Sequence, residues 1–89
     1  MITMMRNADK MFQKLGYEKI VDNKYNVEYK DRFGHTIHMF INESGEYVAH
    51  SFDNNMSGGD GWGHVSYPMD INVLKACIKK IKEIQKKER

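Results

Sequence analysis

Four histidines could bind a metal ion, but their spacing does not favour a shared site. His35 and His38 lie three apart in a strand-like run, so their side chains point to opposite faces and cannot chelate one ion together. We expect His50 to face the core, and His64 lies in a glycine-rich segment. The sequence has one cysteine and no HExxH motif. We therefore predict no metal site and no cofactor.

Glu28 and His38 are the acid–base pair that the predicted strand pairing places opposite each other. They would lie on a sheet face in water, where no pocket shifts a pKa or excludes solvent. We expect a surface ion pair there, and we predict that the protein is not an enzyme.

The segment SGGDGWGH, residues 57–64, is similar to a phosphate-binding loop only in its glycine content. Such a loop needs Lys and Ser or Thr after its last glycine, at the start of a helix. Trp62 and His64 occupy that region here, and the next helix begins later. We expect an irregular connection. The alternatives are a recognition loop displaying Trp62, and a small ligand-sequestering protein or enzyme with a pocket near Trp62 and His64.

Aromatic side chains on the solvent-facing side of the predicted sheet could anchor a partner. Strand alternation places Phe40 on this side with His38 and, on the next strand, Tyr47. These three residues and Trp62 are the partner-binding candidates, and the partner we expect is a protein. The alternative is that the aromatic rings pack under the glycine-rich segment. The predicted outer face consists of Asn26, Glu28, Thr36, His38, Phe40, Tyr47, Ala49 and Ser51.

The net charge of +2 conceals a strong segregation along the chain. Residues 1–74 carry 7 Lys or Arg against 10 Asp or Glu, whereas residues 75–89 carry 7 against 2. Clustered lysines can bind a nucleic-acid backbone by releasing counterions, so a nucleic-acid-binding module is the second function hypothesis. The competing interpretation is a solvated helix face that complements the helix dipole. The lysines concerned are Lys75, Lys79, Lys82 and Lys86.

Two helices are expected to frame the chain. Ala8, Met11, Phe12 and Leu15 have helical spacing, which predicts a helix over about 5–15 that ends at Gly16. Asp70 is a good N-cap for a helix over about 71–87. The apolar stripe predicted to face the core comprises Ile71, Leu74, Cys77, Ile78, Ile81 and Ile84.

Four strand-like runs lie between the helices, at 18–21, 24–30, 35–41 and 46–52, with Val65–Tyr67 as a short extra strand. A three-residue turn, Arg32 to Gly34, matches apolar residues across the first hairpin by pairing Tyr29 with Ile37. That register also pairs Val27 with Met39 and Tyr25 with Ile41. For the second hairpin, a two-residue Ser44–Gly45 turn pairs Ile41 with Val48, Met39 with His50, and Ile37 with Phe52.

The element order predicts an α+β fold with an N-terminal helix, a three- to four-stranded antiparallel meander and a C-terminal helix. Both helices pack on one sheet face, and residues 1–89 form a single domain. The lone cysteine and the lack of a signal peptide or a transmembrane run predict a cytoplasmic protein that does not contact membranes. The open sheet edges permit a homodimer.

The segments ADKMFQKLGYEKI and NKYNVEYK, with the closing DINVLKACIKKIKEI, resemble small uncharacterised proteins of phages and prophages of Gram-positive bacteria. In the closing helix Asp70, Leu74, Ala76 and Ile78 match, whereas residues 53–66 depart from the pattern. The resemblance implies a scaffold and a phage context, and it transfers no catalytic residue. It favours a non-enzymatic accessory protein that binds a host or phage macromolecule.

Overall fold

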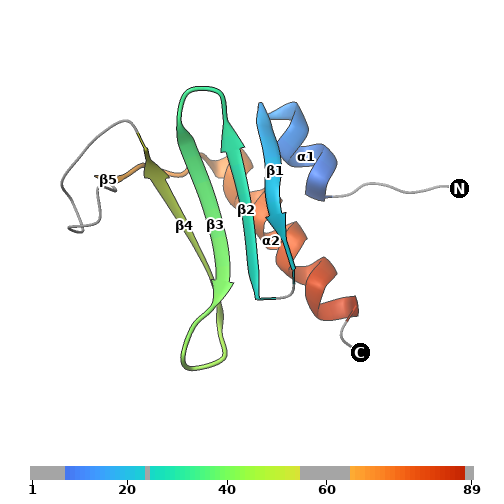
Figure 1. The fold of residues 1–89 in the computed structure, drawn as a ribbon. Helices are drawn as coiled ribbons and strands as arrows, with labels where there is room; N and C mark the ends of the chain where they lie inside the picture. The colour runs from blue at the N-terminus through green and yellow to red at the C-terminus, as the bar shows by residue number, and fades with distance from the viewer. Residues whose placement is uncertain (1–7, 24, 55–64, 88–89) are drawn as a thin grey trace, which may run out of the picture.

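The computed structural model describes residues 8–23, 25–54 and 65–87, and it has the predicted α+β architecture. The elements are α1 (Ala8–Lys14), β1 (Tyr17–Asp22), β2 (Asn26–Asp31), β3 (His35–Ile41), β4 (Tyr47–Asp53), β5 (Val65–Ser66) and α2 (Ile71–Lys87). The strands form one antiparallel meander in the order β1-β2-β3-β4-β5 (Figure 1). The short extra strand is therefore present as β5, and the sheet has five strands.

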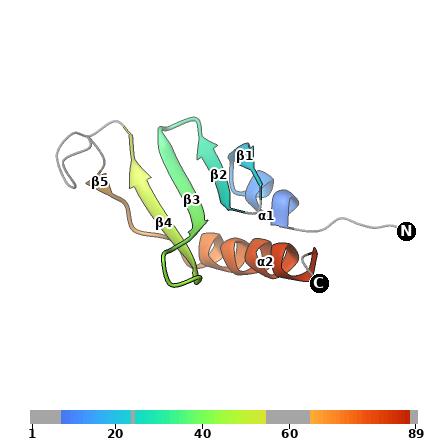
Figure 2. The same cartoon turned by 60° about the horizontal axis from the view of Figure 1, so that its bottom comes forward.

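Both helices lie on the same side of the sheet, where α2 runs beneath the strands and contacts α1 (Figure 2). The centre of the core is a stack in which the rings of Phe12 and Tyr29 lie 3.8 Å apart and nearly parallel. The buried cluster joins α1, the central strands and α2; it contains Phe12, Val27, Tyr29, Ile37, Met39, Val73, Ala76, Cys77 and Ile84. No helix in the described part of the chain is long and apolar enough to cross a membrane.

The local signals at the end of α1 and at the start of α2 are confirmed, whereas the predicted start of the first helix lies outside the described residues. Gly16 follows α1 with a φ of +90°, a conformation that glycine adopts without the steric cost of a Cβ. At the start of α2, the Asp70 carboxylate accepts a hydrogen bond of 2.9 Å from the Asn72 N–H. This bond satisfies one of the free donors of the first turn.

The first hairpin has the predicted register. Tyr29 pairs with Ile37 and Val27 with Met39, and the Ile41 N–H donates to the Tyr25 carbonyl at 3.4 Å. However, β2 begins only at Asn26, and Tyr25, predicted to lie on the apolar face, is 59% exposed.

The predicted register of the second hairpin is wrong by one residue. Ile41 pairs with Tyr47 rather than with Val48, and Met39 pairs with Ala49 rather than with His50. The turn has three residues, 43–45, because the Asn42 N–H donates to the Glu46 carbonyl and the Asn42 side chain accepts from the Glu46 N–H. In the first turn Asp31 accepts in the same way from the His35 N–H. Both turns thus follow an Asx-x-x-Gly pattern, the signal that could have revealed the register.

This shift exchanges the two faces of β4, because successive side chains of a strand point in opposite directions. Tyr47 and Ser51, predicted on the outer face, share the helix side with Met39, and Tyr47 packs against the core. His50, predicted to face the core, lies on the outer face opposite His38.

The helix α2 is also rotated relative to the prediction. Three residues of the predicted core stripe are exposed: Ile71 by 62%, Leu74 by 39% and Ile78 by 54%. Three residues that the prediction left out of the stripe are buried, namely Val73, Ala76 and the charged Lys80. Cys77 and Ile84 are the members of the predicted stripe that are fully buried, and Ile81 packs against the core in a partly exposed position.

Candidate functional site

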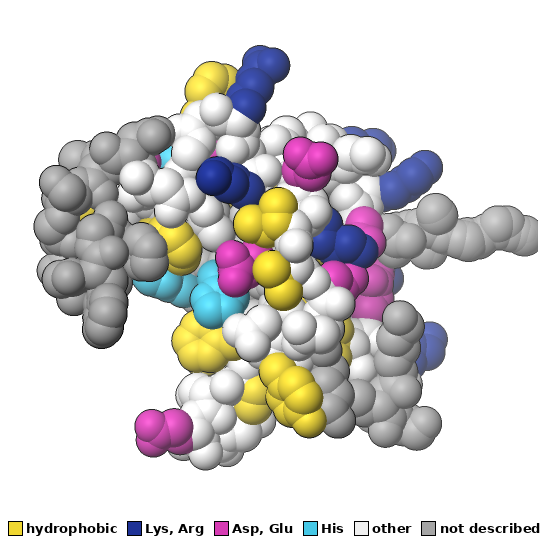
Figure 3. Space-filling view, in the orientation of Figure 1, with side chains coloured by type: hydrophobic (Ala, Val, Ile, Leu, Met, Phe, Trp, Pro, Cys, Tyr) yellow, Lys and Arg dark blue, Asp and Glu magenta, His cyan; other side chains and the backbone are white. Residues whose placement is uncertain are grey.

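The outer face of the sheet carries an acid–histidine row. Glu28, His38 and His50 occupy directly paired positions on β2, β3 and β4. The His38 ring stacks on Phe40 with centroids 4.8 Å apart, and its Nε2 lies 2.8 Å from the Asn26 side-chain oxygen. Figure 3, which looks onto this face, shows histidine and hydrophobic side chains side by side.

The chemistry of this row is limited. Partial burial lowers the pKa of His38, the neighbouring Glu28 opposes that change, and the nearby His50 reinforces it. Glu28 and His38 pair across the strands as predicted, but within the described residues they form no salt bridge, and His38 is hydrogen-bonded to Asn26. Of the four partner-binding candidates, His38 and Phe40 lie together here, Tyr47 lies on the opposite face, and Trp62 is outside the described residues.

His35 lies at one end of the sheet, between two carboxylates. Its Nδ1 is 2.9 Å from Asp31, its Nε2 is 3.8 Å from Asp53, and its ring stacks on Tyr67 at 3.9 Å. Because the carboxylates approach opposite ring nitrogens, one ion could not bind all three groups. No group of three potential ligands in the described ranges could hold a metal. His64 lies outside these ranges.

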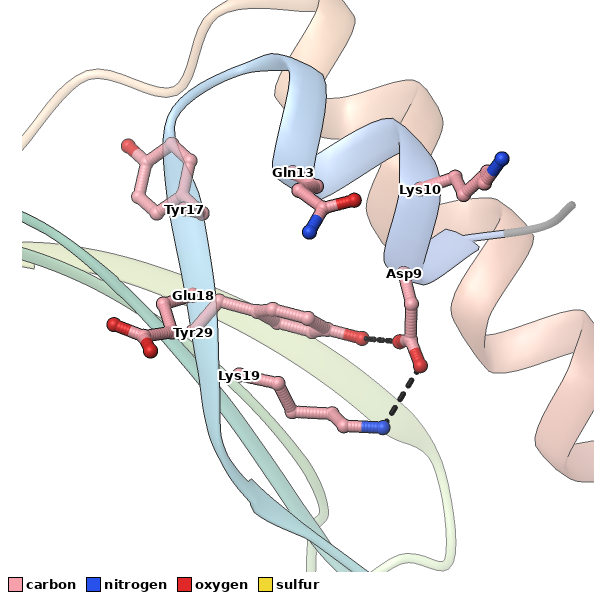
Figure 4. A pocket seen from close by; sticks show the side chains of 7 residues that line it. All are labelled: Asp9, Lys10, Gln13, Tyr17, Glu18, Lys19 and Tyr29. Carbon is pink, nitrogen blue, oxygen red and sulfur yellow. Dashed lines mark hydrogen bonds and ion pairs between the residues drawn. The ribbon is translucent and has the colours of Figure 1, made fainter.

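A polar cluster that the sequence did not reveal joins α1, β1 and α2. The ammonium of Lys19 lies 2.8 Å from both Asp9 and Asp22, and the Lys80 ammonium lies 3.5 Å and 3.1 Å from the same carboxylates. Tyr29 donates a hydrogen bond of 2.5 Å to Asp9. In Figure 4, Asp9 points from α1 toward Tyr29 and Lys19, beside a cavity of about 340 Å³.

A β-bulge makes this cluster geometrically feasible. Lys19 and Asp22 are three residues apart on β1, so a regular strand would point them to opposite faces. The pairing shifts between Lys19 and Val21, which leaves Ile20 as an extra residue. Lys19 and Asp22 therefore both reach the helix side, where Lys80 lies.

The electrostatics of the cluster indicate that it links secondary-structure elements rather than transferring protons. Burial alone would raise the pKa of Asp9, but hydrogen bonds from Lys19 and Tyr29 and the charges of Lys80 and Lys19 outweigh it and lower the pKa. Burial and the Asp9 hydrogen bond raise the pKa of Tyr29. The carboxylate is thus stabilised as an anion and the phenol as a neutral donor, so neither is poised to transfer a proton near neutral pH.

The outward surface of α2 combines apolar and basic side chains. Ile71, Leu74 and Ile78 form an exposed stripe along the helix, which we call the α2 seam. All four lysines of the nucleic-acid hypothesis are exposed as well: Lys75, Lys79, Lys82 and Lys86. Within the described residues none of these lysines forms a salt bridge, whereas Lys80 and Lys19 do. This surface is the candidate functional site.

Compared with family models, with curated proteins and with solved structures, the chain matches none.

Proposed function

We propose that this protein is a non-enzymatic binding module that docks on a protein partner through the outward surface of α2. One observation carries the proposal: Ile71, Leu74 and Ile78 are 62%, 39% and 54% exposed and lie on one side of a single helix. Isolated exposed apolar residues are ordinary, but contiguous ones surrounded by polar residues mark interaction sites.

The energetics of the α2 seam favour burial by a partner. Removing a large aliphatic side chain fully from water contributes about 1.5–3 kcal/mol. Because these three side chains are still partly exposed, a partner that covered them would gain part of that free energy. The exposed lysines along one side of the seam supply part of the polar rim that surrounds the apolar centre of a typical interface. The other large exposed side chains include Ile20 on β1 and Phe33 in the first turn, on elements other than α2.

Nucleic-acid binding is the second candidate, and the four exposed lysines of α2 favour it. A phosphate backbone would attract these charges and bind with a steep salt dependence. It would gain little from the α2 seam, because phosphates and sugars do not need aliphatic contacts. The protein partner accounts for both sets of side chains, and for that reason it is preferred.

The biological setting we propose is that of a phage or prophage accessory protein acting on a host or phage macromolecule. Its support is the sequence resemblance described above. The outer sheet face, with His38 and Phe40, remains a predicted second contact surface.

The test is affinity capture from a Gram-positive bacterial lysate, comparing the wild type with Leu74→Ser/Ile78→Ser. Ile20→Ser is the matched control, because Ile20 is 52% exposed but lies on β1. We expect the double variant to lose the captured protein and the control to keep it, with both unfolding near the wild-type temperature. Capture that survives the double variant would refute docking through the α2 seam.

A further inference from the structure

We propose that the partner presents an acidic amphipathic helix, which packs along the α2 seam as in a short two-stranded coiled coil. This inference rests on the proposed function and specifies the chemistry of its partner. It is supported by the spacing of the seam residues, by the position of the lysines beside them, and by the poor fit of a second copy of the chain.

The spacing along α2 is that of a heptad repeat. With Ile71 at position a, Leu74 falls at d, Ile78 at the next a and Ile81 at the next d. Alternating steps of three and four residues keep a stripe facing one partner helix, whose side chains fit between those of the seam. The exposed part, from Ile71 to Ile78, spans about 10 Å at 1.5 Å per residue, enough for two turns of a docked helix.

The charges beside the seam select an acidic partner. Lys75 and Lys82 occupy the e positions of the two heptads, and both are exposed. Residues at e and g form the salt bridges that set partner choice in coiled coils. Lys79 and Lys86 extend the positive surface farther from the seam. A helix carrying Glu or Asp next to its apolar stripe would therefore complement α2, and a basic helix would be repelled.

A second copy of this chain is a poor occupant. Antiparallel pairing of two α2 helices would place Lys75 and Lys82 of one copy against the same lysines of the other. Parallel pairing would require the g positions to face the partner's e positions. The g positions here are Cys77 and Ile84, which are 2% and 8% exposed because they belong to the core. Both arrangements are unfavourable, so the occupant is a different chain.

The experiment uses two designed 21-residue peptides with Leu at every a and d position. One peptide has Glu at all e and g positions, and the other has Lys there. Binding to the intact protein is measured by fluorescence anisotropy at low and physiological salt. We expect the Glu peptide to bind wild type at least about tenfold more tightly than the Lys peptide.

Charge reversal provides the discriminating variant. Lys75→Glu/Lys82→Glu should invert the preference, so that the Lys peptide binds better, an outcome that partial unfolding could not produce. Ile78→Ser should weaken both peptides, and circular dichroism should show its fold unchanged. Lys86→Glu is the matched control, since it lies outside the e positions and should leave the preference intact.

Several results would overturn the inference: no binding of the Glu peptide, equal binding of both peptides, or a preference that the double variant does not invert. Dimers that form with rising concentration and disappear in Ile78→Ser would assign the seam to a second copy instead. Displacement of the Glu peptide by duplex DNA, together with insensitivity to Ile78→Ser, would favour nucleic acid. If only the peptides fail while lysate capture still depends on Leu74 and Ile78, the proposed function stands and the helical partner does not.

Discussion

The ammonium of Lys80 on α2 lies 3.1 Å from the carboxylate of Asp22 on β1, although 58 residues separate the two in sequence. Lys80 is 7% exposed, and it also reaches Asp9 on α1. A buried cation thus ties the closing helix to the first helix and the first strand. The α2 seam and the four exposed lysines of α2 face outward.

Lys80→Met should reduce the free energy of unfolding by about 1–2 kcal/mol. Methionine retains much of the length of lysine, so packing is largely preserved. The substitution leaves Lys19 as the one cation shared by Asp9 and Asp22. Removing one partner of a buried ion pair lowers the free energy of unfolding more than removing an exposed charge does. Urea denaturation measures the change. Lys79→Met is the control, because Lys79 is exposed and its replacement should shift stability by less than about 0.5 kcal/mol. Equal stability of the two variants would contradict the assigned role of Lys80.

The stability of the protein should fall as the pH drops below about 4. Burial would raise the pKa of both Asp22 and Asp31. Interactions with Lys19 and Lys80 outweigh burial and lower the pKa of Asp22. Hydrogen bonds from His35 and Phe33 do the same for Asp31. A carboxyl group with a lowered folded-state pKa stabilises the fold above its unfolded pKa, near 3.8, and loses that contribution as the pH falls through the folded value.

Urea denaturation between pH 7 and pH 2 tests this dependence. Asp22→Asn removes one titrating group, so the free energy of unfolding should fall less steeply with decreasing pH than it does in the wild type. A variant that loses stability as steeply as wild type on acidification would show that Asp22 does not contribute to the dependence.

The register of the second hairpin can be tested by disulfide formation. His38 and His50 are directly opposite in the structure, so His38→Cys/His50→Cys should oxidise readily. The register expected from sequence would place His38 opposite Ser51 instead. His38→Cys/Ser51→Cys is therefore the matched control, and it should remain reduced because the two side chains point to opposite faces. Non-reducing mass measurement separates the two outcomes.

The native thiol should not interfere with that experiment. Burial raises the pKa of Cys77 to about 12, and the residue is 2% exposed. Since the thiolate is the reactive form, Cys77 should react with an aromatic disulfide reagent at pH 8 only as fast as the protein unfolds. The thiols of reduced His38→Cys/His50→Cys, located on the outer face, are the reactive reference. Rapid labelling of Cys77 in the folded wild type would contradict its burial.

Some features of the fold could be read from local patterns. Gly16, Gly34 and Gly45 mark positions of positive φ, and Asp70 marks the start of α2. Strand alternation predicted the first hairpin, because only one turn length matched Tyr29 with Ile37. The second hairpin was predicted incorrectly because Val48 and Tyr47 are both apolar, so side-chain matching could not distinguish two registers. The shared hydrogen bonding of Asp31 and Asn42 in the two turns was the better signal.

The candidate site could be predicted only in part. The exposure of Lys75, Lys79, Lys82 and Lys86 followed from the charge pattern, and the structure confirms it. The α2 seam was assigned to the core, because Ile71, Leu74 and Ile78 are large aliphatic residues at helical spacing. Hydrophobic spacing identifies an apolar stripe on a helix, but it does not show whether that stripe or a neighbouring side of the helix packs against the sheet.

The amino-acid sequence by itself determined the order of the elements and several of their ends, because turns, caps and alternation depend on residues close together in the chain. The tertiary structure alone decided which side of α2 is buried. The rings of Phe12 and Tyr29 stack in the core, and α2 contributes Val73, Ala76, Cys77 and Ile84 to the same buried cluster. The bulge at Ile20 brings Lys19 and Asp22 to the side of Lys80, so a lysine is buried and the α2 seam is left exposed.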